Sequence, residues 1–244
     1  MRDSHKKEQV IAIVPAAGLG RRFGPGTNKP FQPLDGKPLI IWSLEKLESV
    51  EAITEIIPVL KAEDRKTGQK IFKEHSISKI KKIAPGGRER QDSVYNGLKA
   101  IKDKNSIVLI HDGARPLIDK NLIIKTIEAF FVSGSGRGKQ IEGVILGVPV
   151  KDTIKEAREG IIRKTLLRSS LWAIQTPQIF QYKTILDAYE KAMREGFYAT
   201  DDAALLEKYG AKIKVIMGSY RNIKITTQED LEIAEFLVRK IDQN

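Results

Sequence analysis

The chain lacks cysteine, which excludes disulfides and thiolate metal sites. It has only three histidines, and neither of the other two lies at ligand spacing from His111. No apolar run approaches the roughly eighteen residues of a membrane span, and the polar N-terminus lacks the apolar segment of a signal peptide. We therefore expect a cytoplasmic protein with no membrane partner, whose chemistry rests on acidic, basic and small residues.

Positive charge is in excess, because 42 lysines and arginines face 31 acidic residues and give a net charge of +11. A basic nucleic-acid-binding α/β protein would carry such a charge and would bind DNA or RNA with salt-sensitive affinity. The basic residues are scattered, however, and few aromatic residues lie among them, which favours small anionic substrates and no nucleic-acid partner. The densest basic cluster, Lys79–Arg90, coincides with a glycine turn and indicates a local anion site.

Apolar β-branched runs alternate with amphipathic segments, which predicts an α/β fold with a mostly parallel twisted sheet flanked by helices. The expected strands are Val10–Val14, Glu55–Leu60, Ile80–Ile83, Ser106–His111, Ile141–Val148, Trp172–Thr176 and Ile213–Met217. The expected helices are Pro38–Ser49, Ala62–His75, Arg90–Ile101, Lys120–Val132, Lys183–Glu195, Ala203–Tyr209 and Thr227–Ile241. Ligands bind at the carboxyl ends of such strands, so the turns after Val14, Ile83 and His111 are expected to meet at a site.

The alternation continues through the chain, so we expect residues 1–244 to form a single domain. The glycine-rich segment Val132–Gln140 is then a surface loop and not a domain linker. The stretch Pro149–Ser170 is polar and charged, with a weak strand pattern and a turn signal at Glu159–Gly160. Its residues leave two interpretations open, a protruding β-arm and an ordinary surface hairpin.

The first strand runs into a turn of small residues followed by cations. Ala16, Ala17, Gly18 and Gly20 allow the backbone to approach a ligand closely, so that its N–H groups can point at phosphate oxygens. Arg21, Arg22 and Lys29 then supply positive charge, which indicates a nucleoside triphosphate site. The turn is not a P-loop, because no Gly-Lys-Ser/Thr follows, and it lacks the glycine spacing of a dinucleotide site, so hydride chemistry is not supported.

Three further positions are candidates for ligand contacts. Asp112 directly follows an apolar strand, where a carboxylate binds Mg²⁺ and phosphates or merely caps a turn, and Arg115 beside it favours the ligand site. The glycine turn before Ser93 could recognise a base or ribose, or it could serve only to begin a helix. Lys224 is the one charge among apolar neighbours, which indicates that it points into a site.

Taken together, these segments resemble the 2-C-methyl-D-erythritol 4-phosphate cytidylyltransferase family of the non-mevalonate isoprenoid pathway. The segments are PAAGLGRRFG, Lys29, GGRERQDSV, HDGARP, VKDTIK, RSSLWAIQTPQ, ATDDAALLE and NIKIT, in the family's order. The resemblance implies a Rossmann-like nucleotidyltransferase fold with a protruding β-arm, residues 149–170, that hooks onto a second subunit. It also implies CTP and methylerythritol phosphate as substrates, Mg²⁺ as the cofactor, and a homodimer.

The resemblance assigns a role to each matching position. Residues expected to line the CTP loop are Ala16, Ala17, Gly18 and Gly20, and those expected to select cytosine and ribose are Gly87 and Ser93. Catalytic cations that hold the triphosphate and the reacting α-phosphate would be Arg22, Lys29 and Lys224. Residues expected to bind methylerythritol phosphate are Asp112, Arg115, Arg168 and Thr200, with Asp112 also on Mg²⁺ and Arg168 acting in the neighbouring subunit.

A related family, ribitol 5-phosphate cytidylyltransferase, is the nearest alternative. It would share the CTP loop, Asp112 and Lys224, but the Leu171–Trp172 pair within Arg168–Gln178 more closely resembles the methylerythritol enzyme. The chain also departs from the resembling family, which usually has Pro-Lys-Gln in place of Asn28–Pro30 and often has an aspartate in place of Arg88.

Overall fold

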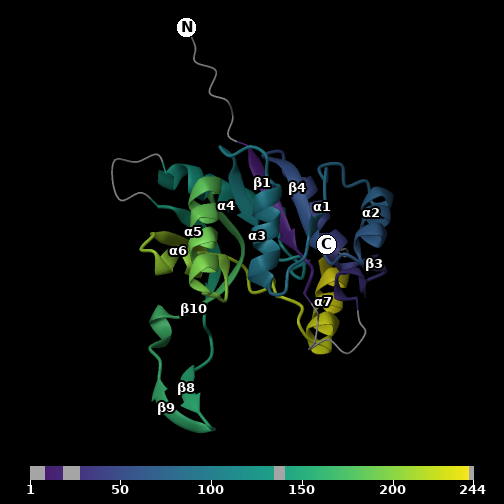
Figure 1. The fold of residues 1–244 in the computed structure, drawn as a ribbon. Coiled ribbons are helices and arrows are strands. Elements are labelled where there is room, and N and C mark those ends of the chain that lie inside the picture. Colours follow the sequence, from purple (N-terminus) through teal and green to yellow (C-terminus); the bar gives the residue numbers. More distant parts are fainter. Residues whose placement is uncertain (1–8, 19–27, 135–140, 242–244) are drawn as a thin grey trace.

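A seven-stranded sheet forms the centre of the molecule (Figure 1). The computed structural model describes residues 9–18, 28–134 and 141–241. From one edge to the other, the strands are β11 (Ile213–Met217), β7 (Gly143–Pro149), β10 (Trp172–Gln181), β6 (Ile107–Ile110), β1 (Val10–Pro15), β4 (Ile53–Leu60) and β5 (Ala84–Pro85). Four of the strand pairs are parallel, and only β10 runs antiparallel to its neighbours β6 and β7. The predicted mostly parallel α/β fold is confirmed.

Helices cover both faces of this sheet, because the central strands are apolar on both sides. In β1, Ala12 and Val14 pack into the core with α1 (Leu39–Glu48), α2 (Arg65–Glu74) and α4 (Lys120–Gly134). The alternate residues Ile11 and Ile13 pack into the core with α3 (Arg90–Ala100), α5 (Tyr182–Glu195) and α6 (Asp202–Lys208). Within the described ranges, no helix is both long enough and apolar enough to cross a membrane.

A third, smaller core lies beside the carboxyl end of β1. It packs Leu34 and Leu39 against Leu231 and Val238 of α7 (Gln228–Ile241). The short elements η1 (Lys29–Phe31), β2 (Pro33–Leu34) and β3 (Lys37–Pro38) belong to this region. Ile225 is fully buried in the same core, which fixes the backbone next to Lys224.

A two-stranded hairpin, β8 (Lys155–Arg158) and β9 (Ile161–Thr165), projects away from the central sheet (Figure 1). Its turn is at Glu159 and Gly160, with φ values of 52° and 78°, as expected for a tight two-residue hairpin turn. The predicted turn at these two residues is confirmed. The short helix η2 (Arg168–Ser170) connects the hairpin back to β10.

Three local predictions are wrong. The expected strand Ile80–Ile83 makes only an isolated bridge from Ile80 to Ile56, and the paired strand is the shorter β5. β10 does not end at Thr176 but continues through the cis Thr176–Pro177 bond to Gln181, with a register irregularity between Gln175 and Gln178. Of the expected loop Val132–Gln140, the first three residues continue α4 and the rest lie outside the described residues.

Candidate active site

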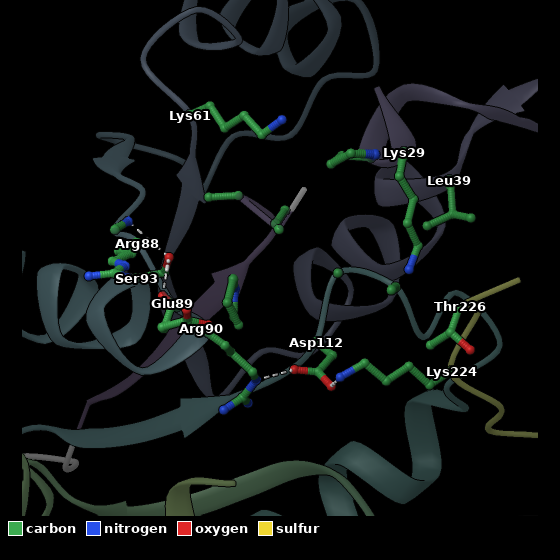
Figure 2. Close-up of a pocket in the computed structure, with 18 residues that line it drawn as sticks. Lys29, Leu39, Lys61, Arg88, Glu89, Arg90, Ser93, Asp112, Lys224 and Thr226 are labelled. Atoms are coloured by element: carbon green, nitrogen blue, oxygen red, sulfur yellow. Dashed lines mark hydrogen bonds and ion pairs between the residues drawn. The ribbon is translucent and has the colours of Figure 1, made fainter. Parts of the chain in front are cut away.

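A cavity of about 640 Å³ opens at the carboxyl ends of the central strands (Figure 2). Eight of the residues expected from the sequence line it: Ala16, Ala17, Gly18, Lys29, Gly87, Ser93, Asp112 and Lys224. They come from the turns after β1, β5 and β6, from η1 and α3, and from the segment before α7. The turns after β1, β5 and β6 therefore meet at one edge of the sheet, as the topology predicts, and η1 and the segment before α7 add Lys29 and Lys224 to the same cavity.

A second cavity of about 380 Å³ adjoins the first, because Arg90, Asp112 and Lys224 line both. Arg115 and Thr200 line this second cavity. Its other lining residues come mainly from β10 and the start of α6. The structure therefore contains two adjoining cavities, and the charged side chains of Arg90, Asp112 and Lys224 form the wall that they share.

The remaining expected residues are not placed in either cavity. Gly20 and Arg22 lie outside the described residues. Arg168 is exposed in η2, lines neither cavity, and donates a hydrogen bond through Nη1 to the carbonyl oxygen of Lys151 at 3.0 Å. The fold of this chain alone therefore does not bring Arg168 to the site.

Asp112 lies at the centre of a cluster of cations (Figure 2). Its Oδ1 accepts a hydrogen bond from Arg90 Nε at 3.0 Å, its Oδ2 lies 2.7 Å from Lys224 Nζ, and Arg115 Nε lies 3.9 Å from Oδ2. Burial alone would raise the pKa of Asp112, but these three cations hold it well below its ordinary value. The carboxylate therefore stays ionised and fixed between the two cavities.

Arg90 also binds a second buried carboxylate, that of Asp202, which was not predicted from the sequence. Its Nη1 and Nη2 donate to Asp202 Oδ1 and Oδ2 at 3.0 and 2.8 Å, and Asp202 is fully buried. The hydroxyl of Tyr189 donates to the same Asp202. Burial would lower the pKa of Arg90, but Asp112 and Asp202 raise it well above its ordinary value. The bidentate geometry fixes the guanidinium plane and thereby the position of Asp112.

The turn before α3 is shaped by tight packing. A side chain at Gly87 would put its Cβ 2.2 Å from the Cβ of Asp92, so only glycine fits without rearrangement. The Ser93 hydroxyl accepts a hydrogen bond from Gly87 N–H at 3.0 Å and donates one to Glu89 O at 3.1 Å. Glu89 and Asp92 form a capping box at the start of α3. The helix therefore presents its positive N-terminal end toward the first cavity, where anions are favoured.

His111 is a buried structural residue beneath the cluster around Asp112. It is fully buried, with Nε2 3.2 Å from Arg115 O and Nδ1 3.1 Å from Thr176 Oγ1. Thr176 Oγ1 accepts the N–H of Asp112 at 3.0 Å, so its own hydrogen is free to be donated to Nδ1, and Nε2 then carries the ring proton. Burial lowers the pKa of His111 to about 4, so the ring is neutral near pH 7.

Comparison with known proteins gives a consistent result. The model of the 2-C-methyl-D-erythritol 4-phosphate cytidylyltransferase family matches residues 10–240. The chain belongs to this family. The enzyme of that name from Clostridioides difficile (strain 630) is 44% identical over 227 residues, with 91% of each chain covered, and that from Shouchella clausii (strain KSM-K16) is 44% identical over 232 residues, with 95% and 97% covered.

A solved structure has the same fold along nearly the whole chain. The 4-diphosphocytidyl-2C-methyl-D-erythritol synthase from Anaerococcus prevotii DSM 20548 superposes with a TM-score of 0.82 at 33% identity, covering 96% of this chain and 97% of the other. Family membership confirms the resemblance seen in the sequence. This member of the cytidylyltransferase family therefore has a transferase fold, with both of its cavities at the expected edge of the sheet.

The donor set of this cytidylyltransferase family member fits Mg²⁺ only in part. The described ranges contain no group of three or more histidine, cysteine or acidic side chains that could hold a metal ion. Asp112 is nevertheless an ionised oxygen ligand on the cavity wall. Magnesium is commonly held by one or two carboxylates together with substrate phosphates, and a single carboxylate such as Asp112 fits that mode of binding.

Proposed function

We propose that the protein transfers CMP from CTP to 2-C-methyl-D-erythritol 4-phosphate and releases pyrophosphate, in the non-mevalonate isoprenoid pathway. The observation that carries this proposal is the pair of adjoining cavities that share Arg90, Asp112 and Lys224. A transfer between two anionic substrates needs two binding spaces that meet at one reacting centre. The cations on the shared wall then lie where the two negative charges meet.

The larger cavity is the proposed nucleotide site. The small residues after β1 and the turn at Gly87 leave room for a nucleotide against the backbone, and the N-terminus of α3 faces the same space. Lys29 points its ammonium group into the cavity from η1 (Figure 2). Lys29, Lys224 and Arg22 would bind the triphosphate and stabilise the charge that develops on the α-phosphate.

The smaller cavity is the proposed acceptor site, with Arg115 and Thr200 for the acceptor's polar groups. A phosphate oxygen of the acceptor attacks the α-phosphorus of CTP, a new P–O bond forms, and the bond to the β-phosphate breaks to release pyrophosphate. No general base is needed, because the second pKa of a phosphate monoester is about 6. This agrees with a site in which His111 is buried and neutral. The residues act by orienting the two substrates and by neutralising charge.

We further propose Mg²⁺ as the cofactor, held by Asp112 together with the nucleotide phosphates. When bound, the ion would neutralise phosphate charge and orient the triphosphate. The ionised state of Asp112, maintained by its three cationic neighbours, supports this role.

The β8–β9 hairpin is the proposed dimerisation arm, in a homodimer that acts in the cytoplasm. Ile161, Ile162 and Leu167 on and beside it are 71%, 58% and 73% exposed, which is unusual for large apolar residues without a partner. Arg168 follows directly and would bind the acceptor phosphate in the neighbouring subunit's site. Its exposed position outside both cavities of its own chain supports action in a neighbouring subunit.

Pyrophosphate release by purified protein tests the function. CTP and Mg²⁺ are supplied with methylerythritol phosphate in one reaction and with ribitol phosphate in another. Turnover with methylerythritol phosphate alone is expected. A preference for ribitol phosphate would retain the nucleotide site but reassign the acceptor, and no turnover with either acceptor from folded protein would contradict the proposal.

A further inference from the structure

A hydrogen bond outside the cluster around Asp112 joins two distant parts of the chain beside the nucleotide cavity. Asn28 Nδ2 donates to Asp64 Oδ1 at 2.5 Å, across 36 positions of sequence. Asp64 is buried, with 6% of its surface exposed, and Asn28 is half-buried. The donor is a neutral amide and the acceptor a carboxylate, which gives the stronger class of hydrogen bond.

The surroundings of this bond indicate that it does more than stabilise helix α2. Asp64 occupies the N-cap position of α2, yet its side chain makes no capping bond to its own helix and is directed to Asn28 instead. The other side-chain oxygen of Asn28, Oδ1, is buried and has no hydrogen-bond partner in the part of the chain that the structure describes. Within those ranges, the Asn28 side chain is therefore held by its Nδ2 bond to Asp64 alone.

Each of the two bonded residues lies next to a lysine that lines the cavity: Asn28 precedes Lys29, and Asp64 is three positions after Lys61. Asn28 is the N-cap residue of η1 and accepts the N–H of Phe31 at 3.0 Å, which fixes the turn that begins with Lys29. Asp64 N–H donates to the carbonyl oxygen of Lys61 at 3.1 Å. Lys29 and Lys61 both line the cavity and approach it from different sides (Figure 2). The Asn28–Asp64 bond therefore ties together the two walls that carry these cations.

We propose that Asn28 and Asp64 are positioning residues that hold Lys29 at the triphosphate in the nucleotide cavity. This inference rests on the proposed function, since it assigns Lys29 a nucleotide to contact. It predicts that loss of the Asn28–Asp64 bond lowers kcat/KM for CTP, and that this loss requires Lys29 to be present. A structural contact alone would instead lower the stability without this dependence on Lys29.

A charge swap tests the bond itself. Asn28→Asp places two carboxylates against each other and is expected to lower kcat/KM for CTP by roughly tenfold or more, as the loss of a hydrogen bond to a charged group predicts. Asp64→Asn keeps an amide oxygen that can accept the bond from Asn28, so its kcat/KM for CTP is expected to fall less. The double variant Asn28→Asp/Asp64→Asn restores an amide-to-carboxylate pair in the opposite direction and is expected to recover most of the loss. Absence of recovery in a folded double variant would overturn the proposal.

A double-mutant cycle tests whether the effect passes through Lys29. Asn28→Ala is expected to lower kcat/KM for CTP by about tenfold in the wild-type background and to have little further effect in Lys29→Ala, because the group it positions is gone. Equal losses in both backgrounds, or no loss in either, would contradict the positioning role. Asn121→Ala on the exposed start of α4 is the matched control and is expected to match the wild type.

Thermal unfolding of every variant separates folding from positioning. If Asn28→Asp does not fold, Asn28→Ala in the two backgrounds decides the question. CTP affinity measured by calorimetry supplies the same comparison without turnover, with weaker binding by Asn28→Ala expected only when Lys29 is present. Wild-type protein without turnover would refute the proposed function, whereas active wild type with unaffected Asn28 variants would refute only the positioning role.

Discussion

Replacement of Arg90 by methionine tests the charge cluster that joins the two cavities. Methionine keeps an apolar stem of similar length but removes the three hydrogen bonds that Arg90 makes, one to Asp112 and two to Asp202. Asp202 is fully buried, and of the two residues that donate hydrogen bonds to its carboxylate in the described structure, only Tyr189 would remain. Removing one partner of a buried ion pair leaves a charge uncompensated, which destabilises proteins by about 3–5 kcal/mol. We expect the free energy of unfolding of Arg90→Met to fall by about this amount.

Urea unfolding, followed by circular dichroism, measures this change. The control is Arg158→Met, because Arg158 lies on the exposed hairpin 3.7 Å from Glu159 and such a pair contributes about 0–1 kcal/mol. Adding Asp202→Asn to Arg90→Met removes the uncompensated charge, so the double variant is expected to be less destabilised than the sum of the two single variants. A loss below about 1 kcal/mol in Arg90→Met, or strict additivity in the double variant, would refute the reasoning.

The remaining predictions concern catalysis, the hairpin and pH. Lys29→Ala is expected to lower turnover roughly a hundredfold, as for the loss of one electrostatic stabiliser, and steady-state kinetics within a few-fold of wild type would remove Lys29 from the mechanism. Arg168→Ala is expected to raise KM for methylerythritol phosphate and leave CTP binding nearly unchanged in calorimetry; equal losses for both ligands would argue against this division. Unfolded His111 takes up a proton near pH 6.5 but folded His111 only near 4, so stability should fall as pH drops between these values, by about 3 kcal/mol in all. Urea unfolding across this range should show a flatter pH dependence for His111→Gln.

The sequence was most informative where local chemistry and chain topology agree. The apolar run of β1 followed by Ala16, Ala17 and Gly18 marks both a buried strand and a close backbone approach, and these residues line the cavity. The parallel alternation then places Asp112 at the same edge, because strands of this kind share one carboxyl edge. Lys224 is recognisable because it is the one charge among apolar neighbours, and the structure places its ammonium group 2.7 Å from Asp112 in the site.

Other features depend on contacts that no local pattern records. Arg90 was visible only as one cation of a basic turn, because its partner Asp202 lies 112 positions away. The sequence predicts that strand β10 ends at Thr176, where Thr176–Pro177–Gln178 would enter a constrained loop. The structure accommodates Pro177 at the register irregularity between Gln175 and Gln178, after which pairing resumes. Near the β5 edge of the sheet, Ile80 and Ile83 pack on the core with their side chains, so their apolar pattern did not require a paired strand.

The three cations around Asp112 are not equivalent, and the difference bears on the proposed reaction. Arg90 is anchored by Asp202, and Arg115 is anchored by the carbonyl oxygens of Asn222 and Ile174 at 2.7 and 3.3 Å. The Lys224 side chain is the most exposed of the three, at 38%, against 28% for Arg90 and 11% for Arg115. A lysine ammonium on a flexible stem reorients more readily than a bidentate guanidinium. When a triphosphate enters, Lys224 is therefore the cation that can turn from Asp112 to the phosphate, while the two arginines keep the carboxylate ionised and in place.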